Sequence, residues 1–170
     1  MGMQEYLNAA KAAAAVVEPQ KAAPKGKGKT GEDPATVAAA VATAMAAVKA
    51  AVAALPEEDR PVAATAVVVW AALQKASPEY RSVFRRDYSP ALAAVLEVPA
   101  GVVHQYDKST GLTSGILGEL VEGGILVESW AGRIRAVTLP GLVVQKPSAA
   151  AVVELGAEEI RKAAAAFLKK

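Results

Sequence analysis

VPAGVVHQYDKSTGLTSGILGELVEGGILVESWAGRIRAVTLPG, residues 98–141, is the stretch that decides the fold. Residues 98–106 predict a short helix, and residues 107–110 predict a turn whose hydroxyl groups cap the next helix. That next helix is expected over residues 111–122, because apolar side chains recur there at helical spacing. The stripe consists of Leu112, Ile116, Leu117, Leu120 and Val121.

The second half of this stretch predicts a β-hairpin. Gly123 and Gly124 end the preceding helix, since glycine readily adopts the left-handed conformation at a helix C-terminus. Residues 125–130 predict one strand, Ala131 and Gly132 the hairpin tip, and residues 133–139 an alternating second strand. The order is therefore helix, turn, helix, hairpin.

This order resembles the winged helix-turn-helix superfamily, in the style of the MarR-like regulators. The residues that carry the resemblance are 112–127, LTSGILGELVEGGILV, and 128–139, ESWAGRIRAVTL. The resemblance implies a protein that binds double-stranded DNA, regulatory or architectural, and acts as a dimer. It implies base contacts from Thr113 and Ser114, phosphate contacts from the turn, and a wing that bears two arginines. The turn and wing residues are Lys108, Ser109, Thr110, Arg133 and Arg135.

The charge of residues 98–141 departs from that pattern. Three basic residues stand against four acidic ones, a net charge of −1. The expected recognition helix contains no arginine, lysine, asparagine or glutamine, the residues that form bidentate contacts with bases. Gly111, Gly115 and Gly118 also suit close approach by another protein. The alternative is a non-enzymatic interaction or assembly subunit, of a complex or a virion, that uses the same fold to bind protein.

Residues 1–33 predict an N-terminal arm. Residues 4–17 suit a short helix, and residues 19–33 a flexible basic linker in which Lys25, Lys27 and Lys29 are available for auxiliary phosphate contacts. Residues 23–30, APKGKGKT, fit a permissive phosphate-loop pattern. A working phosphate loop leaves a buried strand and opens a helix directly, and neither condition holds here.

Asp33 and Pro34 predict the start of a long helix that ends at Leu55, before Pro56. Its apolar positions form a near-heptad seam flanked by alanines, which calls for a partner helix. That partner lies either in the same chain or in a second copy, and both alternatives are open. A dimerisation seam would consist of Val41, Met45, Val48, Val52 and Leu55.

Three further helical regions are expected. Residues 62–75 are apolar nearly all round, so they predict a buried helix with Trp70 as a core anchor. Residues 77–88 predict an amphipathic helix, and Arg81, Arg85 and Arg86 on it are candidates for auxiliary phosphate contacts beside aromatic residues. Ser89 and Pro90 predict a separate short helix over the next eight positions. A final helical region is expected after Ser148, with a break at Gly156.

Composition bounds the class of protein. The chain has 170 residues, 53% of them apolar and 5% aromatic, and a formal net charge of +2. It contains no cysteine and one histidine, His104, which excludes disulfides, thiolate zinc sites and histidine-rich metal sites. The acids Glu57, Glu58 and Asp59 lie in a turn where solvation explains them. We therefore expect no catalytic site, no metal and no cofactor, and we do not expect an enzyme.

The expected fold class is mainly α with a small β-hairpin, α+β, with a winged-helix core and alanine- and valine-rich helical extensions. The expected division is an arm (1–33), a helical packing region (34–97), a winged-helix unit (98–146) and a C-terminal helix (147–170), with 34–170 forming one domain. Glu5 and a short apolar run do not fit a signal peptide, so a cytoplasmic protein is expected. No membrane span is expected, because residues 37–55 are mostly alanine and are interrupted by polar positions.

Overall fold

The computed structural model describes residue 3 and residues 33–107, 109, 112–131, 134–142 and 156–169. Its elements, in chain order, are α2 (Pro34–Ala53), η1 (Glu57–Asp59), α3 (Arg60–Ala76), β1 (Val83–Phe84), α4 (Arg85–Leu96), α5 (Ala100–Val103), β2 (Gln105–Asp107), β3 (Leu112–Ser114), α6 (Ile116–Glu122), β4 (Val127–Ala131), β5 (Ile134–Thr138) and α7 (Ala157–Lys169). The expected α+β class, mainly helical, is confirmed.

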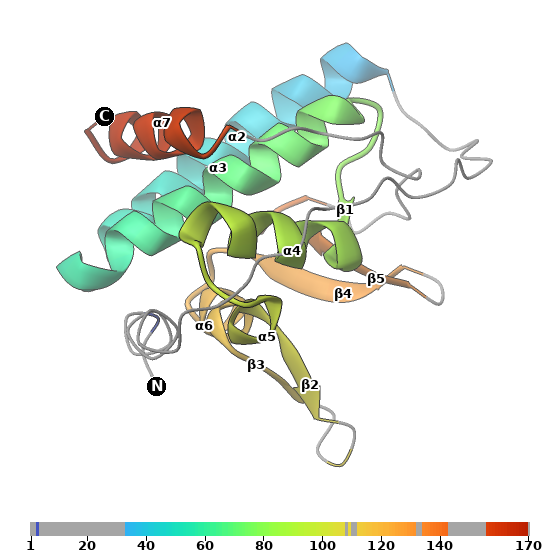
Figure 1. The fold of residues 1–170 in the computed structure, drawn as a ribbon. Coiled ribbons are helices and arrows are strands. Elements are labelled where there is room, and N and C mark those ends of the chain that lie inside the picture. The colour runs from blue at the N-terminus through green and yellow to red at the C-terminus, as the bar shows by residue number, and fades with distance from the viewer. Residues whose placement is uncertain are drawn as a thin grey trace.

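The elements form a helical side and a mixed side. Helices α2, α3 and α7 lie together, α4 lies next to them, and the sheet follows with α5, α6 and the β2–β3 hairpin beyond it (Figure 1). One hydrophobic core runs through both sides and includes residues from α2, α3, α4, α6, β5 and α7. The expected boundary between residues 97 and 98 therefore does not separate two cores.

Helix α2 begins as its sequence predicts. Pro34 is its first residue, and the Asp33 side chain accepts hydrogen bonds from the Thr36 amide at 3.3 Å and from Thr36 Oγ1 at 3.1 Å. Such a cap satisfies amide groups that have no partner within the helix. Helix α2 is long and apolar enough to cross a bilayer by length and composition, and Val37, Ala44, Val48 and Val52 are its buried residues.

The apolar seam of α2 packs within the chain. Val48 and Val52 are each 1% exposed, and the other three seam residues are half-buried against the same core. These three are Val41, Met45 and Leu55. The seam therefore packs in part within the chain, while Val41, Met45 and Leu55 keep partly exposed surface, and the dimerisation alternative stays a prediction.

Helix α3 is the buried helix that its composition predicts. Trp70 is fully buried, and its indole Nε1 donates a hydrogen bond to the carbonyl oxygen of Val137 at 2.9 Å. Tyr88 of α4 is also fully buried, and its hydroxyl donates to the carbonyl oxygen of Ala66 at 2.8 Å. Because these bonds join α3 to β5 and α4, they set the positions of both relative to α3.

The prediction of a helix over residues 77–88 is wrong for residues 77–84. Ser77 and Pro78 mark a turn, in which the Tyr80 amide donates to the Ser77 carbonyl at 3.1 Å. The next residues form β1, where Val83 pairs with Val137 and Phe84 with Ala136 of β5. Helix α4 starts directly after this strand, so the separate helix expected after Pro90 is its second half. Pairing with a distant strand has outweighed a weak local helical preference.

The helix expected over residues 111–122 is only partly correct. Its first part is strand β3, which pairs with β2, so the helix predicted over residues 98–106 is also shorter than expected. Gly115 separates β3 from α6 with a φ of 96°, a conformation that side-chain-bearing residues rarely adopt. A Cβ atom there would lie 2.6 Å from the Val102 carbonyl oxygen and 2.8 Å from that of Val103. Close packing against α5 therefore ends the strand and delays the helix.

The end of α6 and the hairpin agree with the sequence. Gly124 has a φ of 75°, and the Ile125 amide donates to the Leu120 carbonyl at 2.9 Å, as in a left-handed helix end. Ile116, Leu117 and Leu120 are fully buried. Strands β4 and β5 then pair antiparallel, and β1 adds a third strand in the order β1-β5-β4. The tip at residues 132–133 lies outside the described residues.

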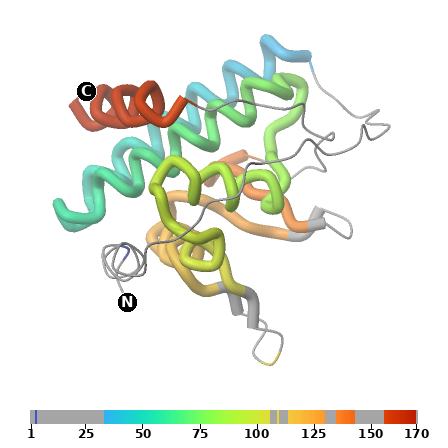
Figure 2. The backbone as a smooth tube through the Cα atoms, viewed as in Figure 1, coloured from blue at the N-terminus to red at the C-terminus, as the bar shows by residue number. Residues whose placement is uncertain are grey.

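Helix α7 covers the helical side. Ile160 and Ala164 are buried and Phe167 is half-buried, which confirms three positions of the expected stripe, while Leu168 is 38% exposed. Arg161 Nη2 donates to the carbonyl oxygen of Val95 in α4 at 3.0 Å. The smooth trace in Figure 2 shows α7 beside α3.

Candidate functional site: an arginine cluster around Glu128

The strongest concentration of charged side chains with defined contacts surrounds Glu128 of β4. Its side chain is 4% exposed, and its Oε2 lies 2.8 Å from Arg85 Nη1 and 3.4 Å from Arg135 Nε. The Nε2 atom of His104 lies 3.9 Å from the same oxygen. Ion pairs with hydrogen bonds to a buried carboxylate are among the stronger polar contacts in proteins. These four side chains form what we call the Glu128 cluster.

Four elements bring the cluster together. Arg85 is the first residue of α4, and it follows directly on β1, which pairs with β5. Arg135 lies on β5 and pairs with Trp130 of β4, two residues beyond Glu128. His104 caps the C-terminus of α5. The pairing of β1 with β5 therefore sets the start of α4 beside the β4–β5 hairpin, and this places the two arginines around one carboxylate.

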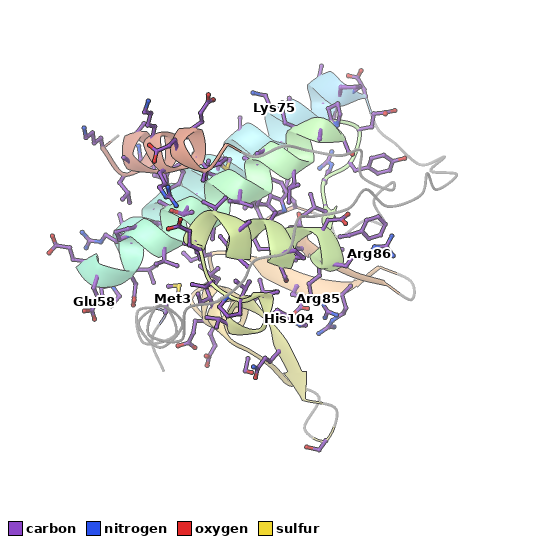
Figure 3. The ribbon with its side chains drawn as sticks, in the orientation of Figure 1. Met3, Glu58, Lys75, Arg85, Arg86 and His104 are labelled. Atoms are coloured by element: carbon purple, nitrogen blue, oxygen red, sulfur yellow. The ribbon has the colours of Figure 1, made fainter. Side chains whose placement is uncertain are left out.

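The cluster continues onto the surface through Arg86. Its guanidinium carbon lies 4.6 Å from the centre of the Phe84 ring, within the range of a cation–π contact, and its side chain is exposed. Figure 3 shows Arg85 and Arg86 together at the side of the molecule where α4 meets the hairpin. We call Arg85, Arg86 and Arg135 the arginine face. Three guanidinium groups stand against the carboxyl groups of Glu128 and of Asp87, which interacts with Arg86, and they leave this face positively charged.

His104 titrates abnormally in this setting. Burial lowers its pKa from the ordinary 6.5, the charges of Arg85 and Arg135 lower it as well, and the carboxylate of Glu128 opposes them. The imidazole is therefore held neutral in the folded protein at a pH where the unfolded chain already binds a proton. By linkage, the folded state loses stability as the pH falls through the unfolded value of 6.5, and this contribution is absent above it.

Replacing His104 with glutamine is expected to remove this pH dependence. The wild-type free energy of unfolding should fall between pH 7 and pH 5 more steeply than that of His104→Gln, because the variant has no imidazole to protonate. Urea unfolding at a series of pH values measures both curves. Buried Asp87, whose pKa is raised by burial, titrates in both proteins and cancels in the comparison. Parallel curves would contradict the assignment.

Some of the predicted site residues lie in the described part of the chain and others lie outside it. Lys108, Thr110, Arg133 and the linker lysines Lys25, Lys27 and Lys29 lie outside the described residues. Ser109 lies in the exposed turn between β2 and β3. Thr113 and Ser114 lie on β3, so their expected position on a recognition helix is wrong. The arginine face gathers three of the predicted DNA-contacting residues, Arg135 from β5 and Arg85 and Arg86 from α4, while Arg81 lies between α3 and β1.

The residues that sequence reasoning missed are Glu128 and His104. From the sequence, Glu128 is one of four acidic residues between positions 98 and 141, and His104 is a lone histidine. Neither has a local signal, since their partners lie on other elements and become neighbours through the pairing of β1, β4 and β5. The nearest sequence signal is the apolar pair Val83 and Phe84 before two arginines, which suits a short strand.

Helix α6 presents a different surface. Its half-buried or exposed residues are Gly118, Glu119, Val121 and Glu122. Burial raises the pKa of Glu119, and the neighbouring carboxylates of Glu122 and Asp59 raise it further. The accessible side of α6 is therefore acidic and apolar, as its composition predicts.

The described residues contain no group of three or more histidine and acidic side chains arranged to hold a metal ion. No protein-family model matches the chain, and no curated protein or solved structure matches it significantly. The class of protein is therefore argued from the α+β fold and from the Glu128 cluster alone.

Proposed function

We propose that this chain is a winged-helix protein that binds double-stranded DNA, chiefly through its phosphate backbone. The observation that carries the proposal is the arginine face where α4 meets the hairpin. The order of α4, α5, α6 and the β4–β5 hairpin, with β1 completing the sheet, supports the winged-helix assignment, and the β2–β3 hairpin between α5 and α6 departs from it. Arginine suits phosphate because its planar guanidinium offers five N–H donors.

The chemistry of this surface favours binding with little dependence on DNA sequence. Contacts to phosphate position a protein on DNA, whereas contacts to base edges specify the sequence. Arg86 is exposed and Arg85 half-buried beside the wing, but α6 has acidic side chains where a recognition helix needs donors. We therefore propose an architectural role, with the basic linker adding phosphate contacts and with neither catalysis nor a cofactor involved. A cytoplasmic homodimer that uses the partly exposed residues of the α2 seam is part of this proposal.

Replacing Arg86 with alanine is expected to weaken binding to duplex DNA equally for different sequences. Arg86 is the exposed member of the arginine face, so its loss removes a phosphate contact without removing a core side chain. The slope of log K against log salt concentration should fall in magnitude by about 1, as for one lost phosphate contact. Fluorescence anisotropy with two duplexes of unrelated sequence measures both quantities.

Lys162→Ala is the matched control, because Lys162 is exposed on α7 and carries the same charge. It is expected to leave affinity and slope nearly unchanged. A double variant, Arg133→Ala with Arg135→Ala, tests the wing. If the wing variant and Arg86→Ala both bind like the wild type, the arginine face is not the DNA-binding surface.

The second candidate is a protein-binding assembly subunit. The specific observation in its favour is the acidic and apolar accessible side of α6, formed by Glu119, Val121 and Glu122. Such a surface repels phosphate but suits a basic protein partner. Absence of any DNA binding by the whole chain at low salt would favour this candidate over the first.

A further inference from the structure

We propose that the buried Glu128 carboxylate competes with DNA phosphate for the partly exposed Arg85 and thereby limits the affinity of the arginine face. This inference rests on the proposed DNA-binding function. It assigns Glu128 as a positioning residue that also competes with the ligand, a role different from that of a simple structural ion pair.

The geometry of the cluster supports competition. Arg85 Nη1 donates a hydrogen bond to Glu128 Oε2 at 2.8 Å, and Arg135 Nε lies 3.4 Å from the same oxygen. A phosphate group offers several such oxygens with the same charge and suits the same guanidinium groups. Arg85 uses Nη1 for the hydrogen bond to Glu128, and its side chain is 24% exposed. Arg85 is therefore held at the edge of the site, where an approaching anion reaches it.

The charges around Glu128 predict that removing its carboxylate charge strengthens DNA binding. With Glu128 ionised, Arg85 and Arg135 together carry an excess of one positive charge, and His104 is neutral in this setting. Removing the carboxylate charge increases the positive potential that a phosphate meets. Because phosphate neutralisation supplies most of the affinity of a non-specific DNA binder, this change strengthens binding. A purely structural ion pair predicts the reverse, since released arginines lose their positions.

Glu128→Gln is the test, because glutamine keeps the size of the side chain and one carbonyl oxygen but not the charge. We expect binding to a short duplex of mixed sequence to become about three- to tenfold tighter, with a salt slope steeper by about 1. Glu122→Gln is the matched control, since it removes the same charge from the exposed end of α6. It should change the affinity by less than about twofold. Circular dichroism checks that each variant is folded.

Glu128→Asp keeps the test decisive if Glu128→Gln does not fold. Aspartate retains the charge but is one methylene shorter, so its ion pair with Arg85 is weaker. The DNA affinity of Glu128→Asp should therefore lie between that of the wild type and a value about threefold tighter. If both Glu128 variants bind DNA with the affinity of the wild type, the inference is overturned and the proposed function still stands. Equal tightening by Glu122→Gln would also overturn it, as an effect of net charge alone. If no protein binds DNA at low salt, the proposed function fails and this inference fails with it.

Discussion

Replacing Trp70 with alanine is expected to lower the free energy of unfolding by about 3–5 kcal/mol, the typical cost of removing a large aromatic side chain from a core. Trp70 is fully buried in α3, and its Nε1 donates to the Val137 carbonyl at 2.9 Å. The substitution leaves a cavity and also removes the hydrogen bond that joins α3 to β5. Urea unfolding followed by far-ultraviolet circular dichroism measures the loss without relying on tryptophan fluorescence.

Two further variants separate the contributions at Trp70. Trp70→Phe retains most of the apolar volume but removes the donor, so a loss of about 1–3 kcal/mol is expected from the unpaired buried carbonyl and the smaller ring. Leu168→Ala on α7 removes a partly exposed side chain and should cost less than about 1 kcal/mol. A Trp70→Ala variant as stable as Leu168→Ala would show that Trp70 does not anchor the core.

Replacing Gly115 with alanine is expected to cost about 3 kcal/mol, through two separate effects. A φ of 96° is unfavourable for a residue with a Cβ atom, and the new Cβ would lie 2.6 Å and 2.8 Å from two carbonyl oxygens of α5. Either the α5 backbone or the start of α6 must move. Thermal and urea unfolding measure the effect.

Two glycines of the same protein serve as controls for Gly115. Gly124 also has a positive φ, 75°, but a Cβ atom added there would meet no atom within 4 Å. Gly124→Ala therefore measures the backbone cost alone, about 1 kcal/mol. Gly101→Ala, with its nearest contact 3.6 Å away at the flexible Gln105 amide, should be neutral or slightly stabilising. If Gly115→Ala and Gly124→Ala have equal costs, the close approach to α5 has no energetic consequence.

The position of Arg135 shows how the site differs from its sequence-based expectation. As a wing arginine it was expected to face DNA, yet it is 17% exposed and lies against Glu128. The sequence correctly indicates which elements supply arginines to this surface. It does not indicate the carboxylate between them, because Glu128 and Arg85 are 43 residues apart and meet only after β1 has paired with β5.

Local sequence determined α2, α3, α7, the end of α6 and the β4–β5 hairpin, because each depends on residues within a few turns or a short hairpin. The cap at Asp33, the apolar length of α3, the stripe of α7 and the glycines after α6 are all short-range signals, and the structure agrees with them. Tertiary structure decided the conformation of residues 77–88 and 105–115. In these segments the difference in local propensity between helix and strand is smaller than the energy gained from packing and strand pairing. Tertiary structure also decided the Glu128 cluster, since charges from four elements become neighbours only when the β1-β5-β4 sheet has formed.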